Sequence, residues 1–137
     1  ETMLAAMSLG AEGVQIGSRF VLSKESSAHI YFKNAIIASK EGDTILTLKE
    51  ITPVRMLKNS FYKKVEDAYL QKKSIEELQK LLGRGRAKKG MFEGDLESGE
   101  LEIGQIAAYL NEIKSAKEII EEIIEDFYST RNRINGL

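Results

Sequence analysis

The stretch GVQIGSRFV, residues 13–21, carries the most information about the fold of this chain. Val14 and Ile16 are β-branched and alternate with Gln15, so the stretch predicts a short strand over about residues 13–17. The strand would end at Gly17 and Ser18, two small residues that leave backbone N–H groups accessible. A strand that ends in such a turn is typical of a phosphate-binding loop.

The position of this stretch in the chain is as informative as its residues. It follows a single predicted helix, residues 1–10, which Gly10 ends because glycine adopts the left-handed cap conformation at low cost. A phosphate-binding turn of this kind follows the last strands of a (β/α)8 barrel, which needs about 250 residues. The chain has 137 residues and begins at Glu1. We therefore expect a truncated chain from the C-terminal part of a larger α/β enzyme.

The composition indicates an ordinary globular protein. The sequence is 42% hydrophobic and 30% charged, with a formal net charge of −1, and it contains no cysteine. These values argue against disorder and exclude disulfides and thiolate chemistry. No apolar run reaches the roughly 18 residues of a membrane helix. We expect a cytoplasmic protein with no membrane partner.

The remainder of the chain predicts mostly helices. Two capping boxes, Ser74 with Glu77 and Ser115 with Glu118, mark helix starts. Residues 44–48 predict a short strand or extended segment. The predicted helices run from Ser26 or Ser27 to about 40, from Pro53 to about 59, and over 61–72, 74–83, 103–112 and 115–130.

The segment between the helices ending near 83 and beginning near 103 is rich in glycine and basic residues. Residues 84–90 predict a basic, solvated loop that has no interleaved aromatic residues and so gives little indication of nucleic acid. Glu93 and Asp95 follow in the sequence. We expect these carboxylates to order the glycine-rich loop, and we predict no metal site.

Several motifs in the same order resemble one family. These are AAMSLGAEGVQIGSRF (5–20), ESSAH (25–29), PVR (53–55), KN (58–59), GMFEGD (90–95) and GQI (104–106). Together they resemble the C-terminal third of the FMN-dependent nitronate monooxygenase (formerly 2-nitropropane dioxygenase) and enoyl-ACP reductase II family. The resemblance covers residues 1 to about 113.

The resemblance implies the C-terminal part of a (β/α)8 TIM barrel with a small, mostly helical cap. Residues 1–52 would form the end of the barrel, namely its seventh helix, eighth strand and eighth helix. Residues 53–113 would form the helical cap with the glycine-rich loop, and 114–137 a C-terminal helix.

The resemblance also implies a cofactor site. In the family, the segment that matches Gln15, Ile16, Gly17 and Ser18 binds the FMN phosphate; the alternative is an ordinary strand-to-loop turn. Gln105 matches a position that returns toward the flavin ring and substrate, and an amide suits that role because it both donates and accepts hydrogen bonds. The alternative for Gln105 is a simple helix N-terminal turn.

Two further residues invite functional roles that we do not assign. His29 is the single histidine, but the family's catalytic histidine would lie outside this chain, so we expect His29 to cap or pack a helix. Arg19 could clamp a phosphate, and we expect instead a structural ion pair with Glu25 or Asp43. We predict no catalytic residue within the chain.

The resemblance implies an FMN-dependent oxidoreductase. The preferred activity is that of an enoyl-ACP reductase II, with NAD(P)H as co-substrate; the alternative is a nitronate monooxygenase that uses O2. The substrate would be a small molecule or bound to acyl carrier protein, which residues 84–89 could dock. A homodimer is allowed, and no nucleic acid is expected. The chain alone would be inactive. The alternative from another class of protein is a non-catalytic helical fragment or split-gene subunit. A small nucleic-acid-binding protein is the least favoured alternative.

Overall fold

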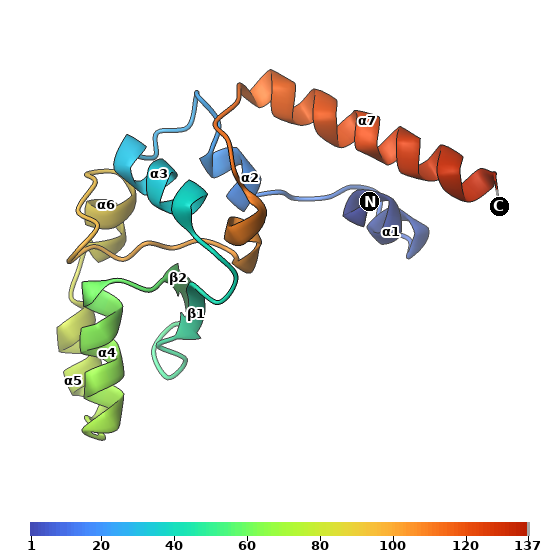
Figure 1. Ribbon diagram of the computed structural model, residues 1–137. Helices are drawn as coiled ribbons and strands as arrows, with labels where there is room; N and C mark the ends of the chain where they lie inside the picture. The colour runs from blue at the N-terminus through green and yellow to red at the C-terminus, as the bar shows by residue number, and fades with distance from the viewer. Residues whose placement is uncertain (137) are drawn as a thin grey trace. The chain divides into compact units, whose positions relative to one another are not determined.

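The computed structural model describes residues 1–136, which are helix-rich with one small sheet (Figure 1). The elements are α1 (Thr2–Ser8), α2 (Ser18–Val21), α3 (Ile30–Ala38), β1 (Thr44–Thr47), β2 (Val54–Leu57), α4 (Ser60–Leu70), α5 (Ile75–Leu82), α6 (Arg86–Met91), the 3-10 helix η1 (Gln105–Tyr109) and α7 (Ala116–Asn135).

The chain divides into two compact units. Unit 1 comprises Glu1–Ser26 and Ile113–Leu137, and unit 2 comprises Ser27–Glu112. The predicted division into barrel end, cap and C-terminal helix stays a prediction. Among residues 1–136, no helix has both the length and the apolar character needed to cross a membrane.

Unit 1 is built on the long helix α7, against which α1 and α2 pack. The predicted capping box at its start is confirmed: the Ser115 hydroxyl accepts from the Glu118 N–H at 3.2 Å, and Glu118 accepts from the Ser115 N–H at 2.6 Å. The helix continues to Asn135, five residues beyond the predicted end. Gly10, with φ +98°, follows α1 as predicted.

The strand predicted over residues 13–17 does not form among the residues that the structure describes. Residue 12 is a bend, residues 13–17 have no regular secondary structure and no ladder, and α2 begins directly at Ser18. A strand requires a neighbour for its N–H and C=O groups. Within the described residues, β1 and β2 pair with each other, so nothing pairs with Val14 and Ile16, which are 40% and 37% exposed.

Unit 2 contains the sheet, an antiparallel hairpin in which Thr44 pairs with Leu57 and Thr47 with Val54. The extended segment predicted over 44–48 is confirmed as β1, but the helix predicted from Pro53 to 59 is wrong. Leu48, with φ +54°, accepts from the N–H groups of Ile51 and Thr52. This turn brings residues 54–57 opposite β1, where cross-strand hydrogen bonds outweigh the helical start signal of a proline.

The core of unit 2 lies between this hairpin and α4. Leu48, Met56, Phe61 and Val65 are fully buried and form one cluster. The helix predicted over 61–72 is confirmed as α4. Tyr69, on this helix, is 37% exposed.

The helix α4 starts with a side chain that links it to a distant loop. Asn59 accepts from the Tyr62 N–H at 2.9 Å and donates to the carbonyls of Leu96 and Gly99 at 2.7 and 2.9 Å. The cap therefore also fastens the glycine-rich segment to α4.

The segments after α4 agree with the sequence in part. The capping box of Ser74 and Glu77 opens α5 as predicted. The basic stretch 84–90 is not a continuous loop, because α6 begins at Arg86 after Gly85, which has φ +73°. The helix predicted over 103–112 is reduced to the short 3-10 turn η1.

Candidate functional site

The four residues predicted to bind the FMN phosphate lie together in unit 1. Gln15, Ile16 and Gly17 are exposed in the segment before α2, and Ser18 is the first residue of α2. A Cβ atom placed on Gly17 would meet no atom within 4 Å. The backbone at this turn is therefore open to a phosphate, which fits the predicted role without enclosing the group.

Arg19, beside this turn, forms the structural ion pair that we expected, but with a different partner. Its guanidinium lies 3.6 Å from the Glu122 carboxylate of α7. Lys114 also contacts Glu122. Arg19 thus helps to hold α2 on α7.

His29 caps α3, as the sequence suggested, in place of Ser26 or Ser27. Its ring Nδ1 accepts from the Tyr31 backbone N–H at 3.2 Å, and the backbone N–H of His29 donates to the Met91 carbonyl at 2.7 Å. The ring lies against Gly94, where a Cβ atom would come within 2.4 Å of Nδ1. His29 therefore joins the start of α3 to the glycine-rich loop and is a structural residue.

Asp95 orders the loop that follows α6, as predicted. It accepts from the N–H groups of Glu97 and Ser98 at 3.2 and 2.9 Å, and also from the Ser98 hydroxyl. The Ser98 bonds hold the pKa of Asp95 below its usual range. Glu93 pairs with Lys88 at 3.2 Å. In the described part of the chain, no group of three or more His, Asp or Glu side chains is arranged to hold a metal ion.

Gln105 lies in unit 2, at the start of η1, and lines a hollow of about 380 Å³. We call this the Arg55 hollow. Its other lining side chains include Lys40, Thr44, Arg55 and Tyr109. The structure thus groups Gln105 with residues that the sequence analysis did not single out. Arg55 is part of the PVR motif. The helix predicted over 53–59 did not place it beside Thr44, whereas the strand does.

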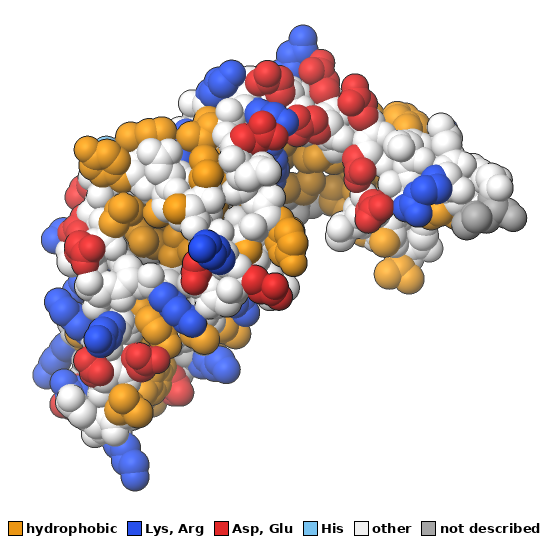
Figure 2. Space-filling view, viewed as in Figure 1, with side chains coloured by type: hydrophobic (Ala, Val, Ile, Leu, Met, Phe, Trp, Pro, Cys, Tyr) orange, Lys and Arg blue, Asp and Glu red, His pale blue; other side chains and the backbone are white. Residues whose placement is uncertain are grey.

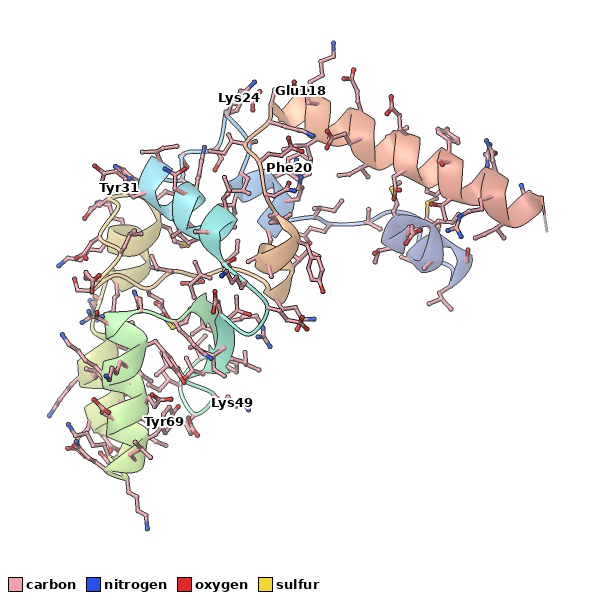
Figure 3. The ribbon with its side chains drawn as sticks, viewed as in Figure 1. Phe20, Lys24, Tyr31, Lys49, Tyr69 and Glu118 are labelled. Atoms are coloured by element: carbon pink, nitrogen blue, oxygen red, sulfur yellow. The ribbon has the colours of Figure 1, made fainter. Side chains whose placement is uncertain are left out.

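A second groove, of about 410 Å³, lies between β1 and α4, beside the Lys49 and Tyr69 labelled in Figure 3. Two tyrosines and two glutamates of its lining are already paired with each other. Tyr69 donates to Glu50 at 2.6 Å, and Tyr62 donates to Glu66 at 2.9 Å. Partial burial and the bond to Glu50 raise the pKa of Tyr69, while the same bond lowers the pKa of Glu50. These internal pairs leave fewer groups for a ligand than the Arg55 hollow does.

The structure thus combines an open glycine turn in unit 1 with a polar hollow in unit 2. Comparison with known proteins shows the family to which this α/β chain belongs. The family model described as "Nitronate monooxygenase" matches residues 1–126. The chain belongs to the nitronate monooxygenase family.

Individual relatives agree with this assignment. The chain is 34% identical over 133 residues to a probable nitronate monooxygenase of Staphylococcus saprophyticus, covering 96% of the chain and 37% of the relative. It is 31% identical over 123 residues to a probable nitronate monooxygenase of Bacillus subtilis, covering 89% and 35%. The structure of FabK from Thermotoga maritima matches with a TM-score of 0.88 and 36% identity, covering 98% of this chain and 42% of that one. The chain therefore spans about two fifths of the length of these relatives.

Proposed function

We propose that this chain is part of an FMN-dependent oxidoreductase of the enoyl-ACP reductase II type, which passes hydride from NAD(P)H through the flavin to an enoyl thioester. The observation that carries the proposal is the match to FabK at a TM-score of 0.88 over 98% of the chain. Family membership over residues 1–126 supports flavin-based redox chemistry in general.

Within this proposal, the residues of the chain bind and orient the cofactor. The open backbone at Gly17 and the hydroxyl of Ser18 would hold the FMN phosphate. Gln105, exposed at the start of η1, would face the flavin or substrate with an amide that donates and accepts hydrogen bonds. A bound flavin would supply the hydride transfer itself.

The proposal extends to the fold of the complete enzyme. Residues 1–52 would complete a TIM barrel, in which Val14 and Ile16 belong to a strand paired with neighbours from the rest of the barrel. Their exposure supports this role. The substrate would be a small molecule or bound to an acidic carrier protein, for which the basic residues Arg84 and Lys89 would offer charge complementarity.

A nitronate monooxygenase is the second candidate. It is favoured by the description of the family model and by the names of the relatives from Staphylococcus saprophyticus and Bacillus subtilis. In that case the flavin would oxidise an alkyl nitronate with O2, and no nicotinamide would be needed.

The test uses the protein that carries this chain, purified with its bound cofactor. Native mass spectrometry and an absorbance scan to 500 nm should reveal one FMN. Enoyl-thioester-dependent NAD(P)H oxidation without O2 would support the reductase, and nitronate-dependent O2 uptake would support the monooxygenase. Ser18→Ala should weaken FMN retention, whereas Ser129→Ala in α7 should not. Absence of flavin from the purified protein would overturn the proposal.

A further inference from the structure

Arg55 is a half-buried cation without an anionic partner. Its guanidinium makes one hydrogen bond within the described residues, from Nη1 to the Thr44 hydroxyl at 3.2 Å. Among residues 1–136, no carboxylate lies within ion-pair distance of it. A cation partly withdrawn from water is costly unless an anion or several acceptors replace the lost hydration. Most of its five N–H donors remain available to a ligand.

The backbone holds Arg55 in place. It lies inside β2, where it pairs with Leu46 of β1 on one side. On the other side, its carbonyl accepts from the Ile103 N–H at 3.0 Å. A binding group mounted on a strand that is bonded on both sides needs little ordering when a ligand arrives.

Lys40 supplies a second cation to the same hollow. It lines the hollow with Arg55, and its ammonium has no ion-pair partner among residues 1–136. Glu41 also lines the hollow but forms no ion pair with either cation within these residues. Two positive charges and one negative charge leave the lining with a net charge of +1, which favours an anion.

The remaining lining suits an organic ligand with a flat ring. Tyr109 is 71% exposed, so much of its surface is available for stacking. Gln105 is exposed beside it, with an amide that can donate and accept. The hollow, of about 380 Å³, falls within the size range of small-molecule sites, which is about 300–1,000 Å³.

We propose that the Arg55 hollow binds a phosphate ester with an aromatic ring, the chemical form of a nucleotide. The phosphate lies on Arg55 and Lys40, and the ring lies on Tyr109. Arg55 is the principal contact, because a guanidinium grips two phosphate oxygens at once, whereas an ammonium acts as a point charge. The hollow shares Gln105 with the position proposed to face the flavin or substrate, so the test below uses variants of Arg55 and Lys40 and leaves Gln105 unchanged.

The test is a titration of the isotope-labelled 137-residue chain, followed by the amide signals in NMR. The probes are AMP, which has ring and phosphate, adenosine, which has the ring alone, and inorganic phosphate. AMP should shift the amides of Gly42, Thr44 and Ile106, and added salt should weaken its binding. Inorganic phosphate should shift the same amides at higher concentration, and adenosine should have almost no effect.

Variants separate this site from general attraction to basic residues. Arg55→Gln should weaken AMP binding about tenfold or more, and Lys40→Gln should weaken it less. The matched control is Lys49→Gln, which removes an exposed lysine of the neighbouring turn and should leave the affinity unchanged. Lys40 lies outside the helices and strands, so its variant keeps the test valid if Arg55→Gln disturbs the hairpin. Equal binding of AMP and adenosine, or equal losses from Lys40→Gln and Lys49→Gln, would overturn the proposal.

Discussion

Gly94 is the residue at which backbone conformation and close packing coincide. It has φ +79°, and a Cβ atom would lie 2.4 Å from Nδ1 of His29. We expect Gly94→Ala to lower the free energy of unfolding by about 3 kcal/mol, because it combines left-handed strain with a clash against the cap of α3. Urea unfolding followed by circular dichroism measures the change.

Gly42 provides the matched control for this prediction. It also has a left-handed backbone, with φ +88°, but a Cβ atom there would meet nothing within 4 Å. Gly42→Ala should therefore cost about 1 kcal/mol, from backbone strain alone. Equal losses in both variants would contradict the role assigned to His29.

Arg86 stabilises unit 2 through its shape more than through its charge. It donates to the carbonyls of Leu81, Leu82 and Ser98 at 3.0, 2.7 and 2.7 Å. Its guanidinium also lies 4.4 Å from the centre of the Phe61 ring. A lysine keeps the charge but cannot reach three carbonyls at once, so Arg86→Lys should lower the unfolding free energy by about 2 kcal/mol.

The control for this prediction is Arg84→Lys, two residues earlier. Arg84 is exposed and takes part in no ion pair within residues 1–136. Its replacement should change stability by less than about 0.5 kcal/mol. A comparable loss from both variants, measured by denaturant unfolding, would contradict the role assigned to the carbonyl and ring contacts of Arg86, because both substitutions keep the charge.

At the scale of elements, the start of α7 has a measurable electrostatic signature. Hydrogen bonds from the Ser115 hydroxyl and N–H, with a smaller contribution from Lys24 at 3.6 Å, lower the pKa of Glu118 from 4.5 to about 2. Figure 3 labels Lys24 and Glu118 at this helix end. Because folding lowers this pKa, ionised Glu118 stabilises the folded chain above about pH 4.5, and this contribution is lost as the pH falls through about 2.

Ser115→Ala removes the hydroxyl but keeps the backbone N–H, so it should raise the pKa of Glu118 only part of the way back toward 4.5, with the N–H and Lys24 keeping the rest of the shift. Carboxyl NMR titration between about pH 2 and 6 measures it. Ser129→Ala, a matched serine within α7, should leave the titration of Glu118 unchanged. An unaltered pKa in Ser115→Ala would mean that the capping box does not form in solution.

The helices and strands also show which structural features the local sequence predicts and which it does not. Both capping boxes were predictable because each partner lies within three residues and needs nothing from the rest of the fold. The strand β2 was not, since a proline at position 53 favours a helix start locally. Its pairing with β1 depends on the turn at Leu48, and the residue types around Leu48 do not predict that turn.

At the scale of the whole molecule, the two units differ in the core that each buries. Among the described residues, unit 1 has only Leu22 and Ile119 as fully or nearly fully buried apolar side chains. Unit 2 buries many more, including Phe32, Met56 and Phe61. Figure 2 shows orange apolar surface exposed on the visible face.

This difference predicts unequal local stability. In native-state hydrogen exchange, the amides of α7 should open at lower free energy than those of α4, because less buried apolar surface resists opening in unit 1. Ile119→Ala should speed exchange in α7 and leave α4 unchanged. Simultaneous exchange of both helices at one free energy would show that the chain unfolds as a single cooperative unit.

Sequence alone determined the family of this protein, both capping boxes, the helices α4 and α5, and the structural role of His29, because each depends on neighbouring residues or on motifs in a fixed order. The tertiary structure decided that residues 13–17 lack a strand partner, that 54–57 pair with β1, and that Arg55 shares a hollow with Lys40 and Gln105. These features join segments up to about 65 residues apart in the chain. Hydrogen bonds and burial between such distant segments produce no periodic pattern in the sequence. These contacts are therefore visible only in the folded chain.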